Sequence, residues 1–77
     1  MEKELIEHIA KSLVENPDAV KVSIVDGEKS TILELAVSEG DLGKVIGKRG
    51  RIAKSIRTIL QAASAKSGRH VVLEILD

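Results

Sequence analysis

The stretch GDLGKVIGKRGRIAKSIRTIL, residues 40–60, decides the fold of this 77-residue chain. Two glycines, Gly47 and Gly50, enclose a Lys-Arg pair, and apolar residues at helical spacing follow them. We expect a tight turn between two helices, because glycine adopts backbone conformations that other residues avoid. Glycine also weakens local structure, and neighbouring positive charges repel each other. The combination indicates that an anion approaches the backbone of this loop closely.

Hydrophobic periodicity and turn residues predict six elements in the order α-β-β-α-α-β. They are helices at 2–15, 42–46 and 51–66 and strands at 19–25, 31–37 and 70–76. Asp41 is expected to cap the short helix, and Gly27 to supply a positive φ in the turn between the first two strands. Alternation places Val20, Val22 and Ile24 on one face of the first strand. The order predicts an α+β fold of two layers, with residues 1–77 forming one domain.

The longest predicted helix carries one apolar stripe. At 100° per residue the stripe comprises Ile52, Ile56, Ile59, Leu60 and Ala63. Ile56 is expected in the core, whereas for Ile46 and Ile52 a core position and a place in a binding groove are equally compatible with the sequence. Lys54 and Arg57 lie opposite the stripe and are expected to face solvent. Gly68 is expected to end the helix.

Charge is divided unevenly along a chain whose net charge is zero. Residues 1–41 hold four lysines and ten carboxylates, whereas residues 42–77 hold eight basic residues and two carboxylates. Two interpretations are equally compatible with this division: the two halves attract each other, or the basic segment forms an anion site.

Several classes of function are disfavoured by composition. The chain has no cysteine, no apolar run long enough to cross a membrane, and an acidic start unlike a signal peptide, which fits the cytoplasm. His8 and His70 are far apart in sequence, so no metal site is expected. Gly43 and Gly47 are one residue too close for a phosphate-binding P-loop, and no nucleophile has a plausible base. We therefore expect neither an enzyme nor a cofactor.

The motif VIGKRGRIAKSI resembles the signature of the KH (K-homology) domain, whose Gly-x-x-Gly loop clamps about four nucleotides. The order of elements is similar to the type II form of that fold. The length and the pattern NPDAV…GDLGKVIGKRGRIAKSIRT resemble the small single-KH RNA-binding proteins of bacteria. This resemblance implies a cytoplasmic RNA chaperone that acts with a larger KH-containing partner in cell elongation, cell shape and the regulation of cell-wall (peptidoglycan) synthesis.

Carried over by residue, the resemblance implies a clamp of Gly47, Lys48, Arg49 and Gly50. Ile46 and Ile52 would form the floor of a groove for bases. The second strand would contribute either its Ile32/Glu34/Ala36 face or its Leu33/Leu35/Val37 face. Arg51 and Lys44 complete the expected set of RNA-binding residues, although for Lys44 contact with RNA is no better supported than another role. Phe, Tyr and Trp are absent, so bases would rest on aliphatic side chains rather than on aromatic rings.

Two kinds of function remain open. The first is a single-stranded RNA-binding module, and the second is a module for dimerisation or partner docking in which RNA binding is secondary. A grip on about four nucleotides is weak, so a second copy or a partner would raise the affinity. No membrane and no small-molecule substrate is expected.

Overall fold

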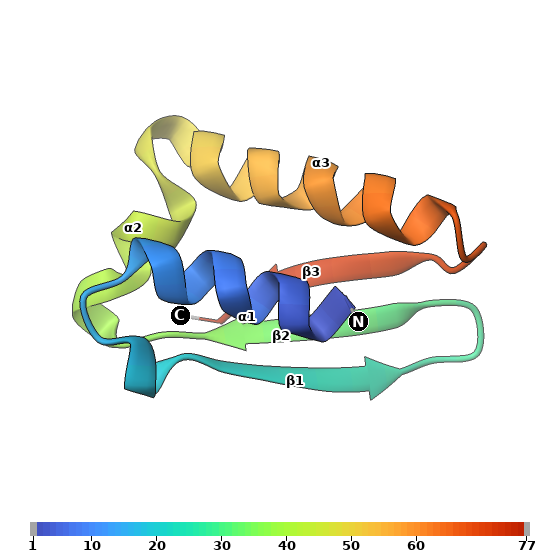
Figure 1. The fold of residues 1–77 in the computed structure, drawn as a ribbon, viewed down its shortest axis with the longest axis horizontal. Coiled ribbons are helices and arrows are strands. Elements are labelled where there is room, and N and C mark those ends of the chain that lie inside the picture. The colour runs from blue at the N-terminus through green and yellow to red at the C-terminus, as the bar shows by residue number, and fades with distance from the viewer. Residues whose placement is uncertain (1, 77) are drawn as a thin grey trace.

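A computed structural model describes residues 2–76 and contains all six predicted elements in the predicted order (Figure 1). They are α1 (Glu2–Leu13), β1 (Lys21–Asp26), β2 (Thr31–Ala36), α2 (Leu42–Ile46), α3 (Arg51–Ala65) and β3 (Val71–Ile75). Short 3₁₀ turns occupy Pro17–Ala19, Glu39–Asp41 and Lys48–Gly50. The α+β fold predicted from the sequence is confirmed. Within the described residues, no helix is long and apolar enough to cross a membrane.

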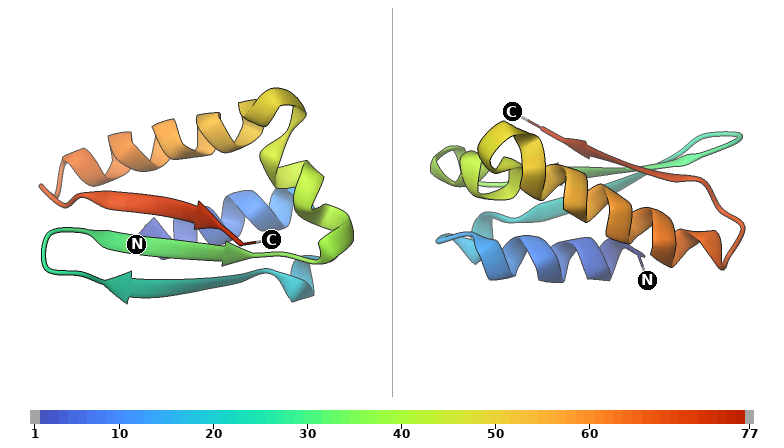
Figure 2. Two further views of the ribbon diagram at one scale, coloured as in Figure 1. Left: turned by 180° about the vertical axis from the view of Figure 1, so that it is seen from behind. Right: turned by 90° about the horizontal axis from the view of Figure 1, so that it is seen from above.

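The three strands form one sheet in the order β1-β2-β3. β1 and β2 pair antiparallel as a hairpin, whereas β2 and β3 pair parallel, with Leu33 beside Leu73. A parallel pair needs a long crossover connection, and α2 and α3 provide it. α1 and α3 pack on the same face of the sheet, so the opposite face has no covering layer (Figures 1 and 2).

The core lies between this helical layer and the sheet. It combines Ile6 and Ala10 of α1 with inward residues of the strands, which include Leu33, Leu35, Val71 and Leu73. The buried residues of α3 are Ala53, Ile56, Leu60 and Ser64. The core position predicted for Ile56 is thereby confirmed.

Two members of the predicted stripe of α3 are exposed. Ile59 is 47% exposed and Ala63 is also exposed, whereas Ser64 is buried. The apolar pattern did not predict the burial of Ser64, because serine is polar. Its hydroxyl group donates a hydrogen bond of 2.8 Å to the Leu60 carbonyl, which makes burial possible.

The hairpin differs from expectation in two details. Ile24 is exposed, although it lies on the same face as the buried Val22, because β1 is an edge strand and Ile24 is near its hairpin end. Gly27 does not have a positive φ; its amide donates to the Ser30 carbonyl at 2.8 Å and closes the turn. Gly68, by contrast, follows α3 with φ 72°, as a helix-ending glycine does.

Candidate nucleic-acid interface

The loop between α2 and α3 has an unusual backbone. Gly47 has φ 78° and ψ 171°, a region that is essentially restricted to glycine. Arg49 and Gly50 follow in the left-handed region, with φ 59° and 74°. The Gly50 amide donates to the Gly47 carbonyl at 3.1 Å, so the turn is closed by its own main chain. The prediction of a tight turn that requires glycine is confirmed.

The two glycines of this loop have different surroundings. A Cβ atom on Gly47 would lie 2.5 Å from Cγ1 of Ile52, so the first residues of α3 leave no space for a side chain there. A Cβ atom on Gly50 would have no atom within 4 Å. Gly47 is therefore required by packing as well as by conformation, whereas the main chain at Gly50 is open to an approaching molecule.

The loop presents three cations at one end of the molecule. Lys48, Arg49 and Arg51 are exposed, and none of them forms an ion pair with another described residue. They surround the beginning of α3, where Gly50 supplies no side-chain cap. The first amide groups of a helix lack partners within the helix and carry the positive end of its dipole. The amide of Arg51 donates to the Lys48 carbonyl, so the loop and the helix start combine unpaired side-chain charges with the positive end of the helix dipole, and both favour an anion.

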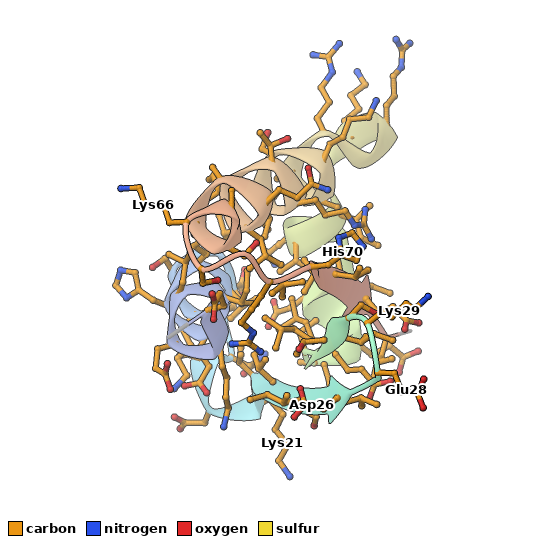
Figure 3. The ribbon with its side chains drawn as sticks, turned by 90° about the vertical axis from the view of Figure 1, so that its right-hand side faces the viewer. Lys21, Asp26, Glu28, Lys29, Lys66 and His70 are labelled. Atoms are coloured by element: carbon orange, nitrogen blue, oxygen red, sulfur yellow. The ribbon has the colours of Figure 1, made fainter. Side chains whose placement is uncertain are left out.

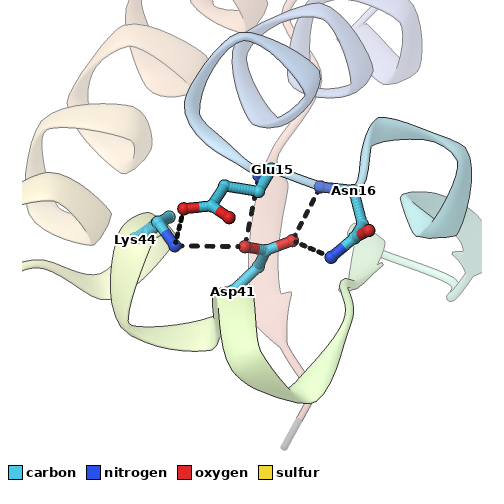
Figure 4. Close-up of polar contacts among 4 residues, drawn as sticks. All are labelled: Glu15, Asn16, Asp41 and Lys44. Atoms are coloured by element: carbon cyan, nitrogen blue, oxygen red, sulfur yellow. Dashed lines mark hydrogen bonds and ion pairs between the residues drawn. The ribbon is translucent and has the colours of Figure 1, made fainter.

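Lys44 lies in a different cluster, centred on Asp41 (Figure 4). Its Nζ atom is 3.2 Å from a carboxylate oxygen of Glu15 and 3.4 Å from one of Asp41. Hydrogen bonds from Lys44 to Glu15 and then to Asp41 raise the pKa of Lys44. The structure thus gives this ammonium group an intramolecular role, and its contact with RNA stays a prediction.

Asp41 does not cap α2 through its side chain, contrary to the prediction. Asp41 is only 1% exposed. Its carboxylate accepts hydrogen bonds from the amides of Glu15 and Asn16 at 3.2 and 3.0 Å. Burial raises the pKa of Asp41, but these amides, Lys44 and the Asn16 side chain outweigh it and leave the pKa lowered. Asp41 therefore joins the end of α1 to the start of α2, which fixes the helix that leads into the loop.

Ile46 and Ile52 are half-buried and pack against the core. Each therefore has a packing role, and each keeps part of its side chain at the surface beside the loop. Of the two faces suggested for β2, the Leu33/Leu35 face is buried in the core and cannot line a groove. The Ile32/Glu34/Ala36 face is half-exposed, but it lies on the side of the sheet away from the helices.

The strand beside α3 is β3 rather than β2. Arg57 reaches across from α3, and its Nε donates to the Leu73 carbonyl at 3.4 Å. A small hollow of about 50 Å³ lies here between Arg57, Leu60 and residues 71–73. Arg57 is exposed, as expected. Its contact with β3 was not predicted, because the place of β3 at the sheet edge follows from the crossover and not from the local pattern of α3.

The described residues contain no group of three or more His, Cys, Asp or Glu side chains that could hold a metal ion.

The chain matches known proteins over nearly its whole length. The family model described as "KhpA/KhpB, KH domain" matches residues 3–75. RNA-binding protein KhpA of Borreliella burgdorferi is 63% identical, over 99% of this chain and 93% of the relative. KhpA of Clostridium acetobutylicum is 61% identical, over 96% and 99%.

Among solved structures, Era in complex with MgGDPNP and nucleotides 1506–1542 of 16S ribosomal RNA is similar to this chain, with a TM-score of 0.66 and 27% identity. The match covers 96% of this chain and 28% of the Era chain. The fold, the Gly-x-x-Gly loop and the full-length similarity agree, and the chain belongs to the KhpA/KhpB KH-domain family.

Proposed function

We propose that this protein binds single-stranded RNA and that the Gly47–Gly50 loop clamps the sugar-phosphate backbone. One observation carries the proposal: the glycine-dependent turn exposes three unpaired cations and the uncapped start of α3 at the same place. Each of these features favours a negative charge. A single-stranded backbone brings several such charges within reach of Lys48, Arg49 and Arg51.

The open side of Gly50 is where the backbone of the RNA approaches the main chain, because a Cβ atom there would meet nothing. The exposed parts of Ile46 and Ile52 then provide an aliphatic surface for bases. The edge of β3 beside Arg57 offers main-chain groups that can bond to base edges. Paired bases cannot enter such a groove, so we expect single strands to bind better than duplexes.

The relatives support this proposal, since they are named RNA-binding proteins and the Era structure contains ribosomal RNA. We also propose that residues 1–77 act as one KH domain and that this domain has no catalytic activity. The family resemblance further suggests a cytoplasmic RNA chaperone that acts with a larger KH-containing partner in cell elongation and cell-wall synthesis. Such a partner, or a second copy, would add a second grip and raise the affinity.

Charge reversal tests the clamp. We expect Lys48→Asp/Arg49→Asp to weaken binding of a short labelled RNA by roughly tenfold or more at moderate salt, because two phosphate contacts are replaced by repulsion. Lys21→Asp/Lys29→Asp changes the net charge equally at exposed positions on the hairpin and should bind nearly as the parent does. Fluorescence anisotropy measures binding, and circular dichroism checks the fold. Equal losses in the two variants would show that net charge, and not the loop, determines binding.

Amide shifts during an RNA titration separate this function from partner docking. Shifts centred on residues 47–52 support the clamp. A protein whose size increases with concentration, and whose amides do not respond to RNA, would be a dimerisation module instead.

A further inference from the structure

The face of the sheet away from the helices is uncovered (Figure 2, left). The register of the strands places its outward side chains in three rows across the sheet. We call this the open face. The first row, at the hairpin end, is Val25, Ile32 and Val72. The second row is Ser23, Glu34 and Glu74, and the third is Lys21, Ala36 and Leu76.

Apart from Lys21, the outer rows of the open face are apolar. Val25 is 46% exposed, Val72 is 38% exposed and Ile32 between them is half-exposed. Leu76 in the third row is 43% exposed, and with Ala36 it borders a hollow of about 430 Å³ that continues to Val37, Glu39 and Leu42. A strand face turned to water usually carries polar residues, so folding alone does not account for these rows.

The middle row brings two like charges together. Glu34 and Glu74 are register partners on adjacent parallel strands, and like charges in that position destabilise a sheet. No basic side chain of residues 2–76 forms an ion pair with either carboxylate. Lys21, the one cation of the three rows, extends past the edge of β1 and away from the sheet (Figure 3). The pair is therefore left without compensation in the isolated chain.

One kind of partner relieves both features at once: a protein surface with a cation between two aliphatic groups. RNA is disfavoured, because its phosphates would face the two carboxylates. A second copy is disfavoured as well, since stacking two open faces about a two-fold axis at the middle row sets each acidic row against its own copy. Charge complementarity thus selects a basic and aliphatic protein partner.

The dimensions of the open face fit a helix. Residues two apart in a strand are about 6.8 Å apart, and residues four apart in a helix are about 6 Å apart, so one turn advances by about one row. Three strands span about 10 Å between their outer axes, which is close to the width of a helix. A helix along the strands would also supply the missing second layer of the sheet.

We propose that the open face binds an amphipathic helix of another protein. That helix carries an aliphatic residue, an arginine or lysine four positions later, and an aliphatic residue four positions after that. Its aliphatic side chains cover the Val25–Ile32–Val72 row and the Ala36–Leu76 row, while its cation lies over Glu34 and Glu74. This surface lies away from the Gly47–Gly50 loop, so the partner and the proposed clamp on the RNA backbone occupy different parts of the molecule.

A synthetic helix is the direct probe. A stapled, alanine-based peptide with leucine, arginine and leucine at successive four-residue intervals is titrated into ¹⁵N-labelled protein. A matched peptide has glutamate in place of the arginine. We expect saturable amide shifts on the open face, with roughly tenfold preference for the arginine peptide, and the same shifts in Lys48→Asp/Arg49→Asp.

Charge exchange makes the test specific. Glu34→Lys/Glu74→Lys should reverse the preference toward the glutamate peptide, whereas Glu7→Lys/Asp18→Lys, with the same change in net charge, should keep the parent preference. The proposal is overturned if no saturable shift on this face is seen up to about 1 mM arginine peptide. It is equally overturned if single-stranded RNA shifts the open-face amides of β1 and β2, or if those amides shift with protein concentration alone, because the occupant is then RNA or a second copy. The amides of β3 are left out of this criterion, since the edge of that strand is part of the proposed base groove.

Discussion

Replacing Gly47 with alanine should destabilise the protein far more than the same change at Gly50. Both glycines have a positive φ, but Gly47, at φ 78° and ψ 171°, lies in a region essentially closed to other residues, with a cost of about 1–3 kcal/mol. The new methyl group would also lie 2.5 Å from Cγ1 of Ile52, and such overpacking typically costs about 1–3 kcal/mol. The two contributions give about 2–6 kcal/mol for Gly47→Ala.

Gly50 provides the matched control. At φ 74° and ψ 14° it is left-handed, and its Cβ position is empty, so only the conformational cost of about 1–2 kcal/mol applies. Urea unfolding followed by circular dichroism gives the free energy of unfolding of each variant. Equal losses at the two positions would contradict the packing argument.

A third variant isolates the contact. Ile52→Ala removes Cγ1 and Cδ1, two of the three atoms that a side chain at position 47 would meet, and leaves Cβ at 2.9 Å. Gly47→Ala should therefore destabilise the Ile52→Ala variant less than it destabilises the parent. The difference between the two losses should be about 0.5–3 kcal/mol, the usual interaction energy of residues in contact. Additive losses would show that the two residues do not interfere as the geometry requires.

Four further outcomes are expected. Ile56→Ala should lower the free energy of unfolding by about 2–5 kcal/mol, because it opens a cavity under α3; a smaller loss in urea unfolding would mean that the helix repacks. Gly50→Asp should lower the free energy of RNA binding more than the free energy of unfolding, because it adds a negative charge where the RNA backbone approaches. Fluorescence anisotropy and urea unfolding of the same sample measure these two free energies. With two to three phosphates bound, log K should fall against log salt with a slope of about −1.4 to −2.1, and a matched duplex should bind less well; a flat response contradicts the clamp. The lowered pKa of Asp41 contributes stability that is complete above the ordinary carboxyl pKa and is lost as the pH falls through the pKa of the folded state. Asp41→Asn should therefore make the midpoint of thermal unfolding less sensitive to acid. An unchanged pH profile would exclude Asp41 as a source of that sensitivity.

The fold could be predicted from sequence because each element carries a local signal. Helical spacing and strand alternation are properties of neighbouring residues, and Asn16-Pro17 and Gly68 mark two of the boundaries. The Gly47–Gly50 turn could be predicted for the same reason, since the need for a positive φ is a property of the residue itself.

Long-range partners could not be predicted in this way. Asp41 stands before a helix, where a capping role is the local expectation, yet its carboxylate binds amides 25 and 26 positions earlier in the chain. Arg57 shows the same limit, because its acceptor, the Leu73 carbonyl, faces α3 only after the crossover has placed β3 at the sheet edge. The hydrophobic pattern of a helix or strand predicts which of its faces is buried. It does not predict which other helix or strand packs beside it.

The uneven charge of the chain permitted two interpretations, and the structure assigns them to different residues. Lys44 pairs with Glu15, and Arg69 pairs with Glu2 at 3.5 Å, so these two cations of the basic half do attract the acidic half. The first pair is exposed and the second is only partly buried, and such pairs contribute little stability. The division of charge is therefore mostly unexplained by folding. The cations at positions 48, 49, 51, 54, 57 and 66 form no ion pair with another described residue, and three of these six lie within the glycine loop or directly after it. Half of these unpaired cations therefore lie at a place where the main chain is also open, at Gly50, and an external anion accounts for both observations.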